Sequence, residues 1–300
     1  MTHATPFGLK LRWSGWLYIL PAAALFVMFM VYPIIYNAIL SLQYVHGTTT
    51  TLSAENYHRL TADPVFWTAI GNTLRWIVGC TIAEMGLGFG IAVVLEMYIG
   101  RGREWFRALL FLPMVITPTV IAIVFTTLYA PEYGLLYGMF RDVGLGSQFP
   151  ALLGSTDWAT WAIIAVNVWQ WVGFFALLYY VGIQRIDPVL WDAAAIDGAQ
   201  GGTLVRRIVF PLLRPTHLSL MILGAIQALQ QFPLIYLMTE GGPAQSTQVL
   251  ATYIFTRGYI ENSMHFASAL SIVLLVLALL IVGIQLLIAG GNFAVGGKNA

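Results

Sequence analysis

Charged residues are scarce in this chain. Of its 300 residues only 9% are charged, whereas 59% are hydrophobic, and a typical soluble domain carries about 25% charged residues. So few charges cannot cover a surface that faces water, and the composition therefore predicts a helical protein that crosses a lipid bilayer several times. The net charge of +1 indicates no nucleic-acid partner and no strongly acidic partner.

Cysteine and clustered metal ligands are also lacking. Cys80 is the single cysteine, so the chain cannot form an internal disulfide or a cysteine metal site. The five histidines are scattered without metal-ligand spacing. Acids do not gather at one depth either, which disfavours an integral-membrane enzyme. We expect no catalytic residue, metal or cofactor on this chain.

Long apolar runs, in contrast, are abundant. A membrane-crossing helix needs about 20 residues, and the first run is too long for the ~7–15-residue apolar part of a cleavable signal. No internal repeat is visible, so we expect a single domain over residues 1–300. Six spans are predicted, at residues 16–42, 69–97, 106–130, 158–183, 214–238 and 265–290.

Lysine and arginine are divided unevenly between the two sets of connecting segments. One set holds ten: Lys10, Arg12, Arg101, Arg103, Arg107, Arg185, Arg206, Arg207, Arg214 and Lys298. The other holds four: Arg59, Arg75, Arg141 and Arg257. Because positive charge favours the cytoplasm, both termini and the loops 98–105 and 184–213 are predicted to be cytoplasmic. Segments 43–68, 131–157 and 239–264 then face outward.

The 184–213 loop predicts a short helix outside the membrane. Asp187 can cap its start, Pro188 suits the first helical position, and Gly198 suits its end. Gly201-Gly202 predicts a flexible joint, followed by a second short helix over residues 203–210. Isolated helices this short are marginal in water. The first helix therefore needs a partner, which is either the protein's own span ends or a separate protein.

The same loop carries a spaced motif. Asp192-Ala193-Ala194 is followed at fixed intervals by Gly198, Ile208 and Phe210-Pro211. It resembles the EAA loop of permease subunits of bacterial ABC importers: Glu-Ala-Ala, three residues, Gly, nine residues, Ile, one residue, Leu-Pro. The spacing is kept, with Asp192 in place of Glu and Phe210 in place of Leu.

Other elements resemble the carbohydrate branch of these permeases, and their order and spacing carry the resemblance over nearly the whole chain. They are Asn72-Thr73, Phe106-Arg107 with Pro113, Thr239-Glu240-Gly241-Gly242-Pro243 with Thr247, and Ala267-Ser268-Ala269. The resemblance implies an all-α membrane protein of six transmembrane helices, with the type I ABC importer permease fold and a cytoplasmic coupling helix. It also implies a bacterial plasma (inner) membrane location.

The resemblance further implies the partners and the docking surface. The partners are a second, homologous permease (expected to be a different chain), two ABC ATPase subunits and an extracytoplasmic solute-binding protein. The coupling helix would dock on an ATPase through Asp192, Ala193, Ala194, Ile196 and Gly198. ATP and Mg²⁺ would be bound by the ATPase, since this chain has no Walker A pattern: Asn299 follows Gly297-Lys298.

Amide and aromatic residues in the fourth and fifth predicted spans are candidates for a sugar path. Polar side chains at membrane depth usually face the bundle interior. As a cluster they favour solute contact, while any single amide can instead link helices. The candidates are Glu84, Asn167, Gln170, Trp171, Gln227, Gln230, Gln231 and Tyr236. The absence of Lys or Arg among them argues against an anionic solute.

Glu84 lies near the middle of the second predicted span. It is expected to bind sugar hydroxyls, to be protonated or to pair with Arg75. Gly86, Gly88 and Gly90 beside it predict a close-packing face. The alternative function is a self-contained secondary transporter or channel for a small polar solute, with Glu84 as a proton site. That alternative predicts inverted repeats and coupling charges, and neither is visible in the sequence.

Overall fold

The protein is mostly helical, as predicted. The computed structural model describes residues 14–46 and 49–296, so Lys10, Arg12 and Gly297-Lys298-Asn299 lie outside the described residues. The first helices precede a short hairpin, and they are α1 (Ser14–Phe26), a π-helical turn (Val27–Val31) and α2 (Tyr32–Ser41). The central helices are α3 (Glu55–Ala62), α4 (Pro64–Met97), α5 (Arg103–Val115), α6 (Pro118–Leu128), α7 (Leu135–Asp142), a 3-10 turn (Gly146–Gln148) and α8 (Ala159–Gln184).

The remaining helices include the interrupted loop and the final span. They are α9 (Pro188–Ile196), α10 (Gly201–Leu204), a π-helical turn (Val205–Val209), α11 (Phe210–Leu212), α12 (Arg214–Leu229), α13 (Pro233–Thr239), α14 (Leu250–Phe255), a π-helical turn (Thr256–Ile260) and α15 (Met264–Gly296). Four stretches are long and apolar enough to cross a membrane: Tyr18–Ser41, Pro64–Met97, Ala159–Gln184 and Met264–Ile288. Two bent helix pairs bring the number to six if each pair counts as one span.

The third predicted span, 106–130, is not one straight helix. It breaks between α5 and α6, which meet at 94°. Pro118 opens α6 and holds Thr117 in an extended conformation with ψ 142°, since a residue before proline avoids the helical region. At 13 residues, α5 is about 20 Å long, which is shorter than the ~30 Å hydrocarbon core.

The fifth predicted span, 214–238, has a bend at its start and a break before its end. At its start the helix over Gly201–Leu212 bends by 70° into α12. At its other end α12 stops at Leu229, and α13 begins only at Pro233. The predicted flexible joint is wrong, because Gly201 and Gly202 form the first turn of α10.

A two-stranded hairpin follows α2 and was not predicted. β1 (Gln43–His46) pairs antiparallel with β2 (Thr49–Leu52), with Gln43 opposite Leu52. Asn56 of α3 fastens it by donating hydrogen bonds to the carbonyl oxygens of Ser41 (3.0 Å) and Gln43 (2.8 Å). This contact joins the end of the first span to the segment that leads into α4.

The core of the bundle is the long packing of α4 against α8, with α5 and α12 on either side. A Cβ on Gly88 would lie 2.8 Å from the Cβ of Phe175, and one on Gly173 would lie 1.8 Å from the carbonyl oxygen of Leu110. The predicted glycine face is therefore confirmed only at Gly88. A Cβ on Gly86 or Gly90 would have no neighbour within 4 Å among the described residues.

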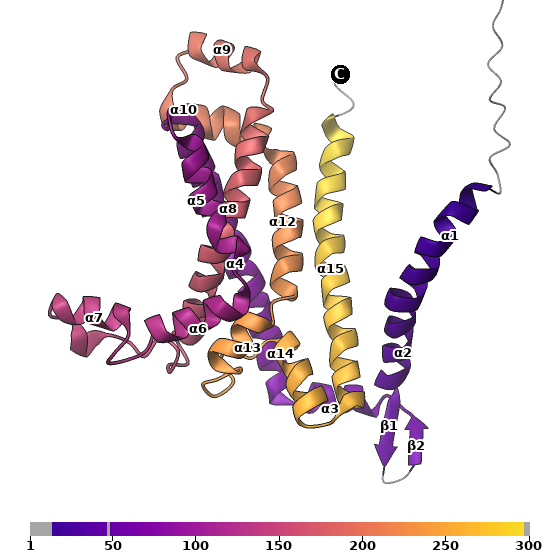
Figure 1. Ribbon diagram of the computed structural model, residues 1–300. Coiled ribbons are helices and arrows are strands. Elements are labelled where there is room, and N and C mark those ends of the chain that lie inside the picture. The colour runs from indigo at the N-terminus through magenta and orange to yellow at the C-terminus, as the bar shows by residue number, and fades with distance from the viewer. Residues whose placement is uncertain (1–13, 47–48, 297–300) are drawn as a thin grey trace, which may run out of the picture.

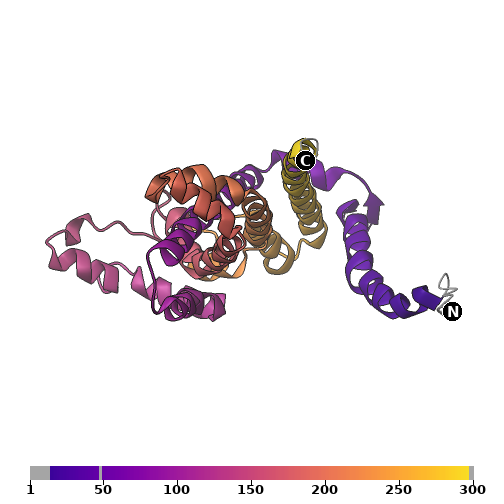
Figure 2. The ribbon, with the colours of Figure 1, turned by 90° about the horizontal axis from the view of Figure 1, so that it is seen from above.

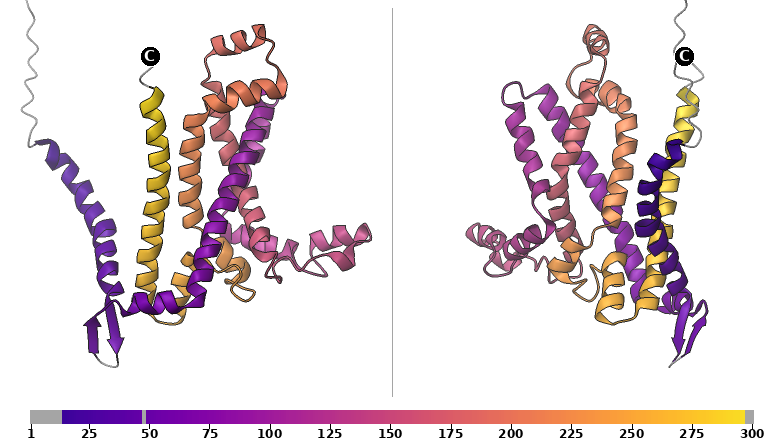
Figure 3. Two further views of the ribbon diagram at one scale, coloured as in Figure 1. Left: turned by 180° about the vertical axis from the view of Figure 1, so that it is seen from behind. Right: turned by 45° about the vertical axis from the view of Figure 1, so that its right-hand side comes forward.

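The helices run between two ends of the molecule. One end carries α9, α10, the first turn of α1 and the last turns of α15, and the other carries the hairpin, α3, α13 and α14 (Figure 1). Seen from above, α1 and α7 extend to opposite sides of the central bundle (Figure 2). Helix α2 packs on α15, while α1 leans away from α15 in the left-hand view of Figure 3. The apolar window within Tyr18–Ser41 is not buried at all within this chain.

Candidate functional site

A groove forms where α8 faces the end of α12. Its volume is about 410 Å³. The break between α12 and α13 creates one end of it, because the helix stops there and Gln230 and Gln231 leave the regular helix. The lining residues are Pro118, Trp171, Phe174, Leu223, Ile226, Gln227, Gln230 and Gln231. Four predicted path residues, one indole and three amides, therefore do share one groove.

A chain of buried polar side chains lies behind this groove. The Nδ2 group of Asn167 donates to Oε1 of Glu84 at 2.8 Å, and Oδ1 of Asn167 accepts from Nε2 of Gln231. Glu84 and Asn167 are each 1% exposed, and Gln231 is 8% exposed. These hydrogen-bonded side chains thus connect α4, through α8, to the helix break beside the groove.

Of the three roles considered for Glu84, pairing with Arg75 is wrong. Arg75 donates instead to the side-chain oxygen of Asn72 at 3.0 Å, because nine residues along α4 keep Arg75 far from Glu84. A direct solute contact by Glu84 is also incompatible with its burial in this conformation.

Three buried polar groups on α8 and α12 lack partners within residues 14–46 and 49–296. Nε1 of Trp171, Nε2 of Gln227 and Oε1 of Gln170 are sealed from solvent and make no hydrogen bond. Native proteins pair most such groups, and an unpaired one costs about 1–3 kcal/mol. Trp171 and Gln227 line the groove through other atoms, because these two donors are closed off from solvent in this conformation.

The structure separates two other predicted path residues from the groove. Gln170 is 1% exposed and donates to the carbonyl oxygen of Ile116 at 3.1 Å, so it holds the bend between α5 and α6. Tyr236 stacks on Phe232 with ring centroids 5.2 Å apart, and it also packs on Phe255. These contacts are aromatic packing within the α13–α14 region.

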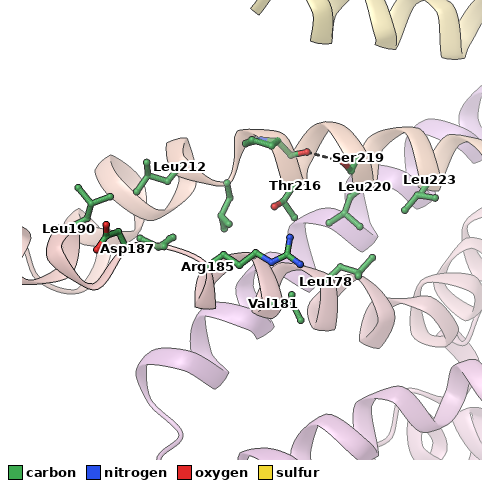
Figure 4. A pocket seen from close by; sticks show the side chains of 14 residues that line it. Leu178, Val181, Arg185, Asp187, Leu190, Leu212, Thr216, Ser219, Leu220 and Leu223 are labelled. Atoms are coloured by element: carbon green, nitrogen blue, oxygen red, sulfur yellow. Dashed lines mark hydrogen bonds between the residues drawn. The ribbon is translucent and has the colours of Figure 1, made fainter. Parts of the chain in front are cut away.

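A second cavity, of about 610 Å³, lies between the end of α8 and the start of α12. Figure 4 shows Arg185 and Thr216 on these facing helices, with Leu178, Leu220 and Leu223 further along. Leu223 lines both cavities, so one surface of α8 and α12 runs from the amide groove to the base of α9. Sequence reasoning used Arg185 only as an orientation charge. Its place just after the fourth predicted span was the sequence feature that could have indicated its position in the lining of this cavity.

Helix α9 is built as the sequence predicts. Oδ1 of Asp187 accepts from the backbone N–H of Val189 at 2.9 Å, with Pro188 in the first turn. Gly198 has φ +70°, a left-handed conformation that glycine adopts without strain. These local features end the helix after about two and a half turns.

The outer surface of α9 is open, apart from one predicted residue. Asp192, Ala193 and Gly198 are exposed, and Ile196 is 86% exposed. Ala194 was predicted to be on the docking surface but is 3% exposed, and its carbonyl oxygen accepts from the backbone N–H of Ala199. Figure 1 shows α9 set off beyond α10, and it forms no extensive contact with another described helix.

Motifs distant in sequence meet at the opposite end of the molecule. Asn72 donates to the carbonyl oxygen of Gln248 at 3.0 Å, and Oγ1 of Thr73 accepts from the N–H of Leu250 at 3.0 Å. Within the following loop, Thr247 donates to the carbonyl oxygen of Gly242 at 2.8 Å. The Asn-Thr pair of α4 thus anchors the Gly-Gly-Pro loop.

Residues 85–290 match the family described as "Binding-protein-dependent transport system inner membrane component". The chain belongs to this family. A probable ABC transporter permease protein, YurN of Bacillus subtilis (strain 168), is 33% identical over 268 residues, covering 88% of this chain and 91% of that protein. The lactose transport system permease protein LacF of Rhizobium radiobacter is 31% identical, covering 89% of this chain and 91% of that protein.

A solved structure has the same fold. It is the crystal structure of a bacterial alginate ABC transporter in complex with an alginate pentasaccharide-bound periplasmic protein, and one of its chains is 25% identical to this one. The match has a TM-score of 0.81 and covers 91% of this chain and 92% of that chain. Family and fold together confirm the predicted type I importer permease fold, and they support an importer subunit over a self-contained transporter.

Proposed function

We propose that this importer permease forms half of the path for a sugar or related uncharged polar solute. The observation that carries the proposal is the groove between α8 and the end of α12, where Gln227, Gln230 and Gln231 face Trp171 and Phe174. Aromatic faces suit the C–H surfaces of a sugar, and amides suit its hydroxyl groups.

The open shape of the groove supports a second permease as its other wall. Only α6, α8, α12 and the turn after α12 contribute lining residues, so a solute in the groove would remain uncovered on one side. A homologous second chain would complete the path, and the carbohydrate branch commonly pairs two unlike chains. Lactose transport by the LacF system is consistent with a saccharide as the solute.

Helix α9 would be the coupling helix. Its exposed residues Asp192, Ala193 and Ile196 and its glycine end form a surface that the described chain leaves uncovered. A helix of 9 residues gains little stability alone, which supports docking on a separate ATPase over packing on the chain's own span ends. This chain would bind no nucleotide, since ATP and Mg²⁺ belong to two such ATPase subunits.

The end that carries α9 would face the cytoplasm. Arg101, Arg103, Arg185, Arg206 and Arg207 lie in the segments at that end, and arginine favours the cytoplasmic side of a membrane. Both termini would then be cytoplasmic, in the inner membrane. The hairpin and the 239–264 segment at the other end would meet an extracytoplasmic binding protein.

Solute-stimulated ATP hydrolysis tests the proposal. The chain would be purified with its partners, reconstituted in nanodiscs with the neighbouring binding protein, and given lactose, maltose, raffinose or glycerol. A saccharide is expected to raise the ATPase rate several-fold, and ammonium or acetate salts are expected to leave it unchanged. Stimulation by an ion, or sugar uptake driven by a proton gradient without ATP, would contradict the proposal.

A further inference from the structure

Glu84 is the one ionisable side chain in the buried polar chain behind the groove. It is 1% exposed, and its hydrogen-bond partner is Asn167 of α8 at 2.8 Å. No basic side chain in the described part of the protein forms an ion pair with it. Ionisable groups at membrane depth are costly and usually functional, so its retention at this position needs an explanation other than solute contact.

The contact with Glu84 sets the direction of the hydrogen bonds among these side chains. Oε1 of Glu84 accepts from the NH₂ group of Asn167, and a side-chain amide carries its donors and its acceptor on opposite sides. The carbonyl oxygen of Asn167 is then left to accept, and the amide of Gln231 must donate its NH₂ group to it. A side-chain amide rotated by 180° would place two donors or two acceptors against each other.

This direction determines what Gln231 presents to the groove. Its NH₂ group is engaged by Asn167, whereas its carbonyl oxygen has no hydrogen-bond partner among the residues described and is not sealed from solvent. Gln231 lines the groove. Without the carboxylate, the amides of Asn167 and Gln231 could reverse together and present an NH₂ group.

We propose that Glu84 is a positioning residue that acts through Asn167 to hold the carbonyl oxygen of Gln231 in the groove as a fixed acceptor for a hydroxyl group of the solute. This inference rests on the proposed function and deepens it, because it assigns a preference among polar solutes. A sugar or polyol hydroxyl donates to that oxygen. A methyl ether in place of that hydroxyl cannot donate, so methylated sugars are rejected.

The test compares three variants of the intact complex. Glu84→Leu removes the acceptor, and Glu84→Gln allows the side-chain amides of Asn167 and Gln231 to reverse. Glu84→Gln combined with Asn167→Asp moves the carboxylate one position along the chain. The carboxylate at position 167 then accepts from the new amide at position 84 and from Gln231, which restores the original direction at Gln231. Glu96→Gln removes a carboxylate from the same helix near its other end, where Glu96 pairs with Arg103 at 3.3 Å, and serves as the matched control.

The readout is the solute concentration for half-maximal ATPase stimulation, with lactose as the first probe and maltose or raffinose if they stimulate the wild type more. Glu84→Leu is expected to raise this concentration about tenfold, and Glu84→Gln about three- to tenfold. The half-maximal concentration of the double variant is expected to lie within about twofold of the wild-type value, and the same is expected of Glu96→Gln. The preference for the sugar over its fully O-methylated form should fall in both single variants and return in the double variant.

Two results would overturn the inference. One is unchanged half-maximal concentration and unchanged discrimination against the methylated sugar in both single variants. The other is a double variant no better than Glu84→Gln, although it assembles and hydrolyses ATP normally. A wild type that no saccharide stimulates would overturn the proposed function itself, and the inference with it. Dependence of transport on a proton gradient, abolished by Glu84→Gln, would assign Glu84 to proton transfer and refute the positioning role.

Discussion

Gly173→Ala should be among the most disruptive single-methyl changes in the bundle. Gly173 faces the backbone of α5, and a Cβ there would lie 1.8 Å from the carbonyl oxygen of Leu110 and 2.5 Å from its carbonyl carbon. Real Cβ contacts essentially never fall below 3.0 Å. Because the obstacle is backbone, α5 must move by about 1 Å or more. Overpacking of this kind costs about 1–3 kcal/mol, and more where nothing can yield.

The displacement has a second cost. Gln170 holds the end of α5 by donating to the carbonyl oxygen of Ile116 at 3.1 Å, and its own Oε1 already has no partner in the described part of the chain. Moving α5 would leave the whole buried amide unpaired, at about 1–3 kcal/mol. The two effects together predict a loss of several kcal/mol.

Thermal unfolding of the complex in mild detergent measures the effect. Gly283→Ala on α15 is the matched control, because its Cβ would meet no described atom within 4 Å and alanine favours a helix by roughly 0.5–1 kcal/mol. Gly173→Ala should melt about 5–15 °C lower than the wild type, at roughly 2–4 °C per kcal/mol, while Gly283→Ala melts at or above it. Equal melting of the two variants would show that α5 does not sit against α8 at Gly173.

Four further predictions concern coupling, the groove and the outer end. Gly198→Val places a β-branched residue at φ +70°, so it should prevent ATPase co-purification, whereas Gly198→Asn, which tolerates that conformation, should retain most of it; equal behaviour would refute a role for the helix end. Asp192→Glu should preserve ATPase binding and Asp192→Lys should abolish it, as pull-down would show, and an unaffected Lys variant would remove this surface from the interface. Trp171→Ala and Gln230→Ala should each raise the half-maximal sugar concentration several-fold without loss of assembly, and unchanged values would assign both residues to packing. Arg257→Met should lower stability by about 1–3 kcal/mol, because Arg257 pairs with Asp63 at 3.2 Å and donates to the Tyr253 hydroxyl at 2.9 Å, and that hydroxyl in turn donates to Asp63. The exposed Arg141→Met is the control, and equal melting temperatures would refute the contribution.

The features that sequence predicts well here depend on local chemistry. The cap at Asp187 and the stop at Gly198 follow from residues within a few positions of one another, and the division of segments between two ends follows from the order of the apolar runs. The structure confirms each of these features. The burial of Asn167 and Gln231 also follows, since amides at membrane depth turn toward the bundle.

What sequence missed depends on partners from distant segments. Tyr236 stacks on Phe232 and meets Phe255 edge to face, and nothing in their spacing distinguishes this from a solute-facing tyrosine. Glu84 meets Asn167 across 83 positions of sequence, so its partner could not be read from its own helix, where Arg75 was the nearest cation. The near right angle at Thr117 could have been suspected from Pro118, but prolines also occur in spans that bend only slightly.

The central claim is that this chain is one subunit of an ATP-driven importer. The most direct test is to extract the tagged chain from its native membrane in mild detergent, determine the mass of the complex and identify its components. The account predicts one copy of this chain with a second permease chain and two ATPase subunits, and loss of the ATPases in Gly198→Val. A chain that purifies alone or only with copies of itself, without an ATPase, would contradict the account.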